Sequence, residues 1–326
     1  MPLLMLRYDL RCPAFGKQSH AELYQTALDQ CEWGDRNGFL SVTLSEHHGS
    51  PDGYLPNPMI MAAAVAARTK KLRIMISALI APLHDPISLA EDLAVLDLLS
   101  GSRITPVLAG GYVKSEFECF GKQLSDRKAY MDEIAEVLTK AWTGEPFEYA
   151  GRTVRVTPRP AREPRPVIWM GGSSAAAARR AARSADYFIP SEPKYFEIFR
   201  QERVKLGKRD PGPFPQQGDN FLYVAEDPDA AWEKISPYLL HETNSYGQWV
   251  QEAGTDSPYE VYQNTDDLRA SGRYPVMTPE ALIEKARGMG PMETLLLHPL
   301  AGGMDPELSW ESLRLFESKV LPALRG

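Results

Sequence analysis

Short apolar runs rich in β-forming residues alternate with amphipathic stretches along nearly the whole chain, and this alternation limits the possible folds more than any other feature. The runs number about eight, which is the number of strands in a closed parallel barrel. We expect strands over residues 3–8, 39–45, 72–80, 103–109, 167–170, 186–190, 220–225 and 294–298. We expect helices over residues 20–36, 58–68, 86–99, 127–142, 175–185, 194–206, 228–240, 279–287 and 306–321.

The run from Ile74 to Ile80 is apolar at nearly every residue, as in a parallel strand that is buried on both faces. The chain of 326 residues is long enough for a (β/α)8 barrel, which commonly needs about 250 residues. The alternative is an open, doubly wound sheet. Its usual G-x-G-x-x-G turn after the first strand is missing, because residues 9–16 contain a single glycine, Gly16. The sequence therefore predicts an α/β fold, a (β/α)8 TIM barrel formed as one domain by residues 1–326.

Two stretches interrupt the alternation. Residues 147–166 are rich in proline and arginine, which predicts an extended surface segment. Residues 241–276 are polar and aromatic, with Tyr246, Trp249 and Tyr259 among them, and are expected to form an insertion late in the barrel. A long insertion of this kind is typical either of a lid or substrate wall, or of a helical segment that covers a dimer face.

Composition and charge exclude several classes of protein. The 36 Lys and Arg residues and 43 Asp and Glu residues give a formal net charge of −7, without the basic face that nucleic-acid binding requires. Cys12, Cys31 and Cys119 lie far apart and lack CxxC spacing, so they indicate neither a disulfide framework nor a zinc site. No run approaches the ~18 apolar residues of a membrane helix, and the apolar run 3–6 is too short for a signal peptide. We therefore expect a cytoplasmic protein that binds neither nucleic acid nor membranes.

Two histidines follow the second expected strand, in the segment Ser45-Glu46-His47-His48. In a barrel, residues just past the carboxyl end of a strand line the active-site mouth, and an imidazole there can transfer protons because its ordinary pKa is about 6.5. The residues alone leave open whether His47 or His48 is catalytic, or whether one of them packs against Glu46 and orders the loop. A metal site is disfavoured, because adjacent histidines diverge and HExxH spacing is absent.

A glycine-rich turn follows the fifth expected strand, where Met170-Gly171-Gly172-Ser173-Ser174 precedes an alanine-rich helix. Glycines let a phosphate approach the backbone, a serine can cap the helix, and the helix amino end offers unpaired N–H groups. The pattern favours a phosphate site. The alternative is an ordinary capped turn between a strand and a helix.

Three other strand ends give weaker signals. The segment Gly110-Gly111-Tyr112 would let a planar ring come close to the backbone. The small side chains of Ser77 and Ala78 either leave room for a flat ligand or pack tightly. His298 either lines the mouth or is a hydrogen-bonded core residue.

Taken together, these segments resemble the bacterial luciferase-like flavin-dependent monooxygenase family. The likeness covers nearly the whole chain except residues 241–276. The matching segments, in chain order, are Ser45-Glu46-His47-His48; Asn57-Pro58; Pro86 with Ala90-Glu91-Asp92 and Leu96-Asp97; Gly110-Gly111-Tyr112 with Glu116-Phe117 and Phe120-Gly121; the turn from Gly171 to Ser174; and Thr278-Pro279-Glu280.

The resemblance implies a (β/α)8 barrel that binds reduced FMN across its mouth and uses dioxygen to oxidise a small organic substrate. It also implies that His47 transfers a proton and that the Ser77–Ala78 peptide bond is cis beneath the flavin ring. A homodimer and a separate flavin reductase are further implications. The expected cofactor-binding residues are Ser77, Ala78, Gly110, Gly111, Tyr112, Met170, Gly171, Gly172, Ser173 and Ser174. The expected substrate-pocket residues are Tyr8, His48, Tyr54 and His298, with Tyr112, Trp249 and Tyr259 as further aromatic candidates.

The chain departs from luciferase at Gly110, where luciferase has an arginine that binds the phosphate. Arg179, Arg180 or Arg11 are candidates to replace it. The Gly110 form is similar to branches of the family that include both FMN users and deazaflavin users. The alternatives to an FMN-dependent monooxygenase are therefore a hydride-transferring oxidoreductase with a deazaflavin coenzyme and a non-catalytic flavin-binding barrel.

Overall fold

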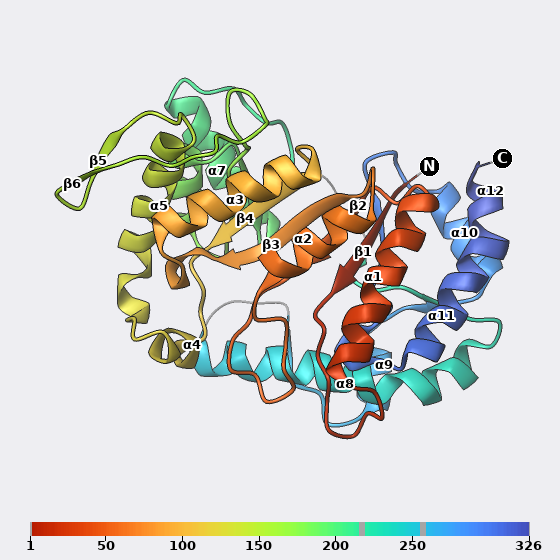
Figure 1. Ribbon diagram of the computed structural model, residues 1–326. Helices are drawn as coiled ribbons and strands as arrows, with labels where there is room; N and C mark the ends of the chain where they lie inside the picture. Colours follow the sequence, from red (N-terminus) through yellow and green to blue (C-terminus); the bar gives the residue numbers. More distant parts are fainter. Residues whose placement is uncertain (1, 215–218, 255–258, 326) are drawn as a thin grey trace.

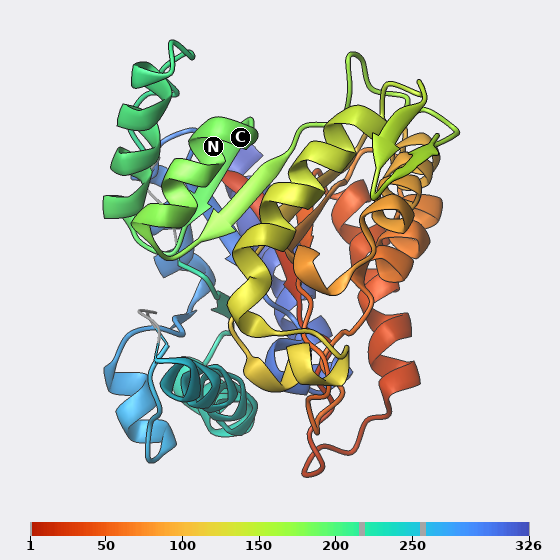
Figure 2. The ribbon, with the colours of Figure 1, turned by 90° about the vertical axis from the view of Figure 1, so that its left-hand side faces the viewer.

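The computed structural model describes residues 2–214, 219–254 and 259–325. Its main sheet has seven parallel strands in the order β11-β1-β2-β3-β4-β7-β8. The sheet curls, and the helices that follow its strands lie along its outer side (Figures 1 and 2). The strands are β1 (Leu3–Tyr8), β2 (Ser41–Leu44), β3 (Arg73–Ile80), β4 (Ile104–Ala109), β7 (Trp169–Gly172), β8 (Tyr187–Pro190) and β11 (Thr294–Leu297).

Except at the carboxyl ends of α8 and α11, the longer helices begin and end close to the expected residues. Several begin at an acidic or amide side chain that caps the first turn and is followed by proline, as at Asn57, Asp85 and Asp227. The helices of eight or more residues are α1 (His20–Arg36), α2 (Pro58–Arg68), α3 (Pro86–Ser100), α5 (Arg127–Ala141), α6 (Ala175–Ser184), α7 (Pro193–Lys205), α8 (Pro228–Ala253), α10 (Pro279–Arg287) and α11 (Pro306–Leu315). The shorter helices are α4 (Lys114–Cys119), α9 (Thr265–Ala270) and α12 (Leu321–Arg325).

Burial alternates along β1, as expected for a strand between outer helices and a barrel interior. Leu4, Leu6 and Tyr8 are buried, and the Tyr8 hydroxyl donates a 3.1 Å hydrogen bond to Gln30 on α1. Met5 and Arg7, on the other face, are partly exposed although the strand is central. The interior face of the sheet therefore borders open space at one end.

The curled parallel sheet with outer helices confirms the predicted (β/α)8 barrel, with a difference at the seventh expected strand, residues 220–225. There, β9 (Tyr223–Val224) pairs with β10 (Val276–Met277) in a separate parallel sheet. On its other edge β9 hydrogen-bonds to α11. The Val224 N–H donates a 2.8 Å hydrogen bond to Ser312 Oγ, and the Tyr223 hydroxyl donates a 2.7 Å bond to the Leu308 carbonyl.

Both irregular stretches contain more secondary structure than the sequence predicts. Residues 147–166 include an antiparallel hairpin of β5 (Phe147–Tyr149) and β6 (Arg152–Val154). The helix expected over residues 228–240 continues to Ala253, so the first part of the 241–276 insertion is the second half of α8. Figure 1 shows α8 running across the end of the sheet where the strands of the main sheet finish. The middle of the insertion, residues 255–258, lies outside the described residues.

Among the described residues, none of the helices combines the length and the apolar character that crossing a membrane requires.

Candidate functional site

A cavity of about 420 Å³ opens at the carboxyl ends of the strands, under the second half of α8. We call it the mouth cavity. It is formed by segments from both halves of the chain, as the barrel topology requires. Its lining residues are Arg7, Ser45, Glu46, His47, Tyr54, Ser77, Ala78, Ile80, Val107, Ala109, Gly111, Tyr112, Glu116, Gly171, Gly172, Ser173, Ile189, Pro190, Ser191, Asn220, Tyr246, Val250 and Tyr259.

A histidine and a buried glutamate form a hydrogen-bonded pair in the wall of the mouth cavity. His47 Nδ1 lies 2.8 Å from Glu116 Oε1, and the same oxygen accepts a 2.9 Å bond from the His48 backbone N–H. A carboxylate at Nδ1 makes this nitrogen the donor, which leaves Nε2 of His47 able to accept and return a proton. The geometry is that of a carboxylate-oriented general acid and base.

Aromatic rings surround the His47 imidazole. Trp249 stacks on it with ring centres 4.4 Å apart, and Tyr54, Tyr112 and Tyr246 present their edges or faces at 4.8–5.9 Å. Burial raises the pKa of Tyr54, Tyr112 and Tyr246, so their hydroxyls stay neutral. The imidazole therefore lies among aromatic rings whose hydroxyls are neutral, with the Glu116 carboxylate at its Nδ1.

Glu46 forms a second carboxylate centre beside the first. Its Oε1 accepts 2.9 Å bonds from Nε2 of both His48 and His84, and Oε2 accepts a 2.5 Å bond from the Ile80 N–H. Burial opposes ionisation of Glu46, but the hydrogen bonds from the two histidines and the Ile80 N–H outweigh it and lower the pKa to about 2. The Glu46 carboxylate thus connects the segment after β2 to the end of β3. His48 is one of its hydrogen-bond donors.

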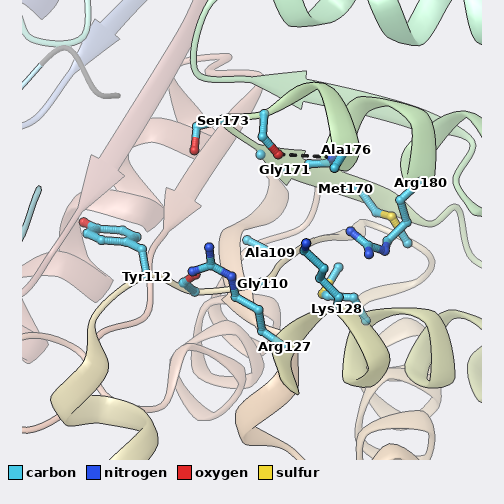
Figure 3. Close-up of a pocket in the computed structure, with 15 residues that line it drawn as sticks. Ala109, Gly110, Tyr112, Arg127, Lys128, Met170, Gly171, Ser173, Ala176 and Arg180 are labelled. Atoms are coloured by element: carbon cyan, nitrogen blue, oxygen red, sulfur yellow. Dashed lines mark hydrogen bonds between the residues drawn. The ribbon is translucent and has the colours of Figure 1, made fainter. Parts of the chain in front are cut away.

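A smaller pocket of about 160 Å³ adjoins the mouth cavity and shares Gly111, Gly171 and Ser173 with it. We call it the anion pocket (Figure 3). Cationic side chains extend into it from α5 and α6. Its lining residues are Ala109, Gly110, Gly111, Tyr112, Arg127, Lys128, Met131, Met170, Gly171, Gly172, Ser173, Ser174, Ala176, Ala177 and Arg180.

Two cations of the anion pocket are held in place by neighbouring groups. Arg127 Nη1 donates a 2.9 Å bond to the Gly111 carbonyl, and Arg180 Nε donates a 2.7 Å bond to Asp132 Oδ1. The terminal nitrogens of Arg180 and the exposed ammonium of Lys128 remain available to a ligand.

Of the three arginines expected as candidates, Arg180 lines the anion pocket. Arg179 is exposed and outside the pocket lining, and Arg11 is buried against Asp9 and Asp52.

The backbone of the anion pocket fits a phosphate group. Ser174 caps α6 by accepting a 3.2 Å bond from the Ala177 N–H, and the first-turn N–H groups at this end have no partner within the helix. A Cβ atom on Gly172 would lie 2.6 Å from Ala177 Cβ, so this close approach requires glycine. Cations, helix terminus and glycine turn together match a phosphate monoester. The Ser77–Ala78 peptide bond, in the wall of the mouth cavity, is cis.

Three residues expected in the substrate pocket lie elsewhere, and those predictions of position are corrected. Tyr8 points outward to α1, because the alternation of β1 places it on the helix side. His48 is turned toward Glu46 and packs on Phe120 at 4.7 Å. His298 is 1 % exposed behind the cavity wall. Tyr54, Tyr112 and Tyr259 do line the mouth cavity, whereas Trp249 covers His47 from outside its lining.

His298 belongs to a buried charged network. Its ring nitrogens lie 3.7 Å from Asp9 and 3.5 Å from Glu242. These three residues offer ligand atoms within 4.8 Å of one another, as a metal site would. Arg11 lies 3.3 Å from Asp9 and Arg7 lies 3.9 Å from Glu242, so guanidinium groups already supply the positive charge that a metal ion would bring.

The sequence assigned no role to four charged residues that line the two cavities: Glu116, Arg7, Arg127 and Lys128. Glu116 was part of a recognised motif but had no assigned role. Arg7 had a signal, since it is the one charged residue in the apolar strand from Leu3 to Tyr8. Arg127 and Lys128 stand at the start of an amphipathic helix, where cations are ordinary, and nothing local marks them as ligands.

Comparisons with known proteins agree with this geometry. The sequence model described as luciferase-like monooxygenase matches residues 11–294. An FMNH2-dependent dimethylsulfone monooxygenase of Pseudomonas putida is 27 % identical over 69 % of this chain and 66 % of its own. An F420-dependent glucose-6-phosphate dehydrogenase of Nakamurella multipartita is 26 % identical over 100 % of this chain and 98 % of its own. Three other curated relatives are matched over 44–49 % of their own length, so the chain spans about half of these proteins.

A solved structure is similar along the whole chain. The monooxygenase RslO1 from Streptomyces bottropensis superposes with a TM-score of 0.76 at 26 % identity, covering 98 % of this chain and 99 % of its own. The family match covers well over half of the residues, including all lining residues of the anion pocket and all those of the mouth cavity except Arg7. The chain therefore belongs to the luciferase-like monooxygenase family.

Proposed function

We propose that this protein is a monooxygenase that uses reduced FMN and dioxygen to oxidise a small organic substrate. The observation that carries the proposal is the continuity of the anion pocket with the mouth cavity in which His47 stands. A phosphate monoester ends a flavin mononucleotide, and the anion pocket offers the cations Arg127, Lys128 and Arg180 for it.

Reduced FMN, when bound, would supply the two electrons that activate dioxygen, so that one oxygen atom enters the substrate and the other leaves as water. His47 would hold and return a proton at Nε2, because Glu116 fixes its Nδ1–H. Trp249 and Tyr54 would exclude water from the imidazole by covering its face and edge. We further propose that a separate reductase delivers the reduced flavin and that the chain acts as a homodimer.

The second candidate is hydride transfer with a deazaflavin coenzyme. The relative named as F420-dependent, matched over the whole chain, favours it. The deazaflavin carries a phosphodiester with a further chain attached, whereas FMN ends at a doubly charged phosphate. The three cations around one small pocket therefore support FMN.

The test compares the two coenzymes without oxygen and then adds oxygen. Reduced FMN and reduced F420 are titrated anaerobically into the purified protein and followed by fluorescence. We expect tighter binding of FMN, and then oxygen consumption with ¹⁸O incorporation when a panel of organic substrates is supplied. Tighter binding of F420 would overturn the proposal in favour of hydride transfer. Binding of FMN without consumption of reduced flavin on any substrate would favour a non-catalytic barrel.

A further inference from the structure

One guanidinium in the wall of the mouth cavity has no part in the proposed proton transfer or phosphate binding. Arg7 lies on the inner face of β1, and 13 % of its side chain is exposed. A cation near the carboxyl end of a central strand is costly to bury. Because Arg7 lines the mouth cavity, its remaining exposure is toward the place where a substrate would bind.

Most N–H groups of Arg7 are unused. A guanidinium has five N–H donors, and in the described residues Arg7 makes one hydrogen bond, from Nη2 to the Tyr246 hydroxyl at 3.2 Å. Its ion pair with Glu242 Oε1 spans 3.9 Å, which is too long for a hydrogen bond. The group therefore offers donors to an oxygen acceptor in the cavity and accepts nothing itself.

A buried carboxylate behind the wall of the mouth cavity, that of Glu242, already offsets the charge of Arg7. Glu242 is 2 % exposed and lies beside it, and the neighbouring Arg11 is offset by Asp9 at 3.3 Å and Asp52 at 2.6 Å. A carboxylate brought to Arg7 would add an excess negative charge to a buried region, which is unfavourable. A neutral carbonyl oxygen would accept the same hydrogen bonds without that cost.

The surface beside Arg7 is aromatic. The rings of Tyr246 and Tyr259 stack at 4.5 Å with planes 19° apart, and the hydroxyls of Tyr246 and Tyr54 share a 2.7 Å hydrogen bond. The hydrogen bond and the stacking hold these rings in place. Fixed aromatic rings favour contact with an aromatic ring of a ligand, which can meet their edges.

We propose that the mouth cavity selects a neutral, flat, ring-bearing substrate that presents a carbonyl oxygen to Arg7. The inference rests on the proposed function and narrows it to a class of substrate. Arg7 would be a substrate-binding residue that determines specificity, and Glu242 would act through Arg7 by setting the preference for neutral over anionic acceptors.

The test uses three probes of equal ring size: acetophenone with a neutral carbonyl, ethylbenzene with no acceptor, and benzoate with a charged one. Their dissociation constants are measured by calorimetry with the full chain, and the matched two-ring series of 2-acetylnaphthalene, 2-ethylnaphthalene and 2-naphthoate is measured beside them. We expect the ketone of at least one series to bind about tenfold or more tightly than both of its partners, the size of a hydrogen bond to a charged group. Ketones that bind no better than the hydrocarbons, or carboxylates that bind best, would overturn the proposal.

Two variants test whether Arg7 and Glu242 cause the preference for the ketone. Arg7→Met keeps the length of the side chain without its donors, and should abolish the advantage of the ketone over the hydrocarbon. Glu242→Gln removes the counter-charge and should shift the preference about tenfold toward the carboxylate; should it fail to fold, Arg7→Met decides alone. An undiminished ketone preference in Arg7→Met would overturn the assignment.

Reduced FMN is titrated into the same samples, which separates this inference from the proposed function. Its affinity should be the same in wild type and Arg7→Met, because the proposal has Arg7 contact the substrate and not the flavin. Weaker binding of reduced FMN in Arg7→Met would mean that Arg7 contacts the flavin ring, which would also lie in the mouth cavity, and would overturn the proposal. A wild-type protein that binds ketones through Arg7 but does not bind FMN would refute the proposed function and leave the role of Arg7 intact.

Discussion

Removing the charge of Arg180 should weaken the binding of reduced FMN about tenfold and leave the binding of reduced riboflavin nearly unchanged. Arg180 lines the anion pocket, and its side chain is 12 % exposed. Its Nε is occupied by Asp132 at 2.7 Å, which leaves the two terminal nitrogens for the phosphate. Riboflavin lacks the phosphate. Its affinity therefore shows any indirect effect of the substitution on the site, but not the loss of the contact between Arg180 and the phosphate.

The magnitude follows from those contacts. A hydrogen bond to a charged group contributes about 1.5–3 kcal/mol. Asp132 already offsets part of the charge of Arg180 and is 53 % exposed, so we take the lower end, about 1.5 kcal/mol, which is about tenfold in affinity. The ratio of the riboflavin and FMN dissociation constants in Arg180→Gln should fall by that factor relative to wild type.

The assay is an anaerobic fluorescence titration of both flavins. Arg179→Gln is the matched control, because Arg179 is the adjacent residue of the same helix, is exposed and lies outside the pocket lining. Its ratio should equal that of wild type. Equal weakening of FMN and riboflavin in Arg180→Gln, or an equal loss in both variants, would refute the placement of the phosphate in the anion pocket.

Three further predictions concern other parts of the site. His47→Gln should lower turnover about 100-fold or more while reduced FMN still binds, and unchanged turnover would remove its role in proton transfer. Because the pKa of Glu46 falls from 4.5 to about 2 on folding, its ionised form stabilises the protein by on the order of 3 kcal/mol above pH 4.5, and this is lost as the pH drops from 4.5 toward 2. Urea unfolding of Glu46→Gln should therefore depend less steeply on pH in that window, and an equal slope would contradict the assignment. Gly172→Ala should cost about 1–3 kcal/mol, measured as a lower Tm, because its Cβ would lie 2.6 Å from Ala177 Cβ; an unchanged Tm would show that the turn relaxes.

Local sequence determined the elements and their order. The helices His20–Arg36, Pro58–Arg68 and Pro279–Arg287 have the expected bounds, because caps, prolines and apolar spacing within a few residues fix where a helix starts and ends. The helix from Pro228 ran on to Ala253 although Pro237 lies inside it, since packing across the barrel end overrides a local signal that would stop it.

Many residues that the motifs predicted for the site lie together in the structure. His47, Tyr54, Tyr112, Ser173 and the cis Ser77–Ala78 peptide all lie in the wall of the mouth cavity. They follow strand ends, and in a parallel barrel all strand ends meet at the same opening, so position along the chain is enough to bring them together.

Tertiary structure decided which side chains complete the site. Tyr8 and Arg7 are neighbours in the same strand, yet one packs on α1 and the other faces the cavity, because successive residues of a strand point to opposite faces. His298 lies behind the wall of the mouth cavity, where its ring nitrogens contact Asp9 and Glu242. Arg127 and Arg180 meet at one pocket from two helices. Contacts between residues far apart in the chain depend on how the barrel curls and how its helices pack. A local pattern of residues does not predict them.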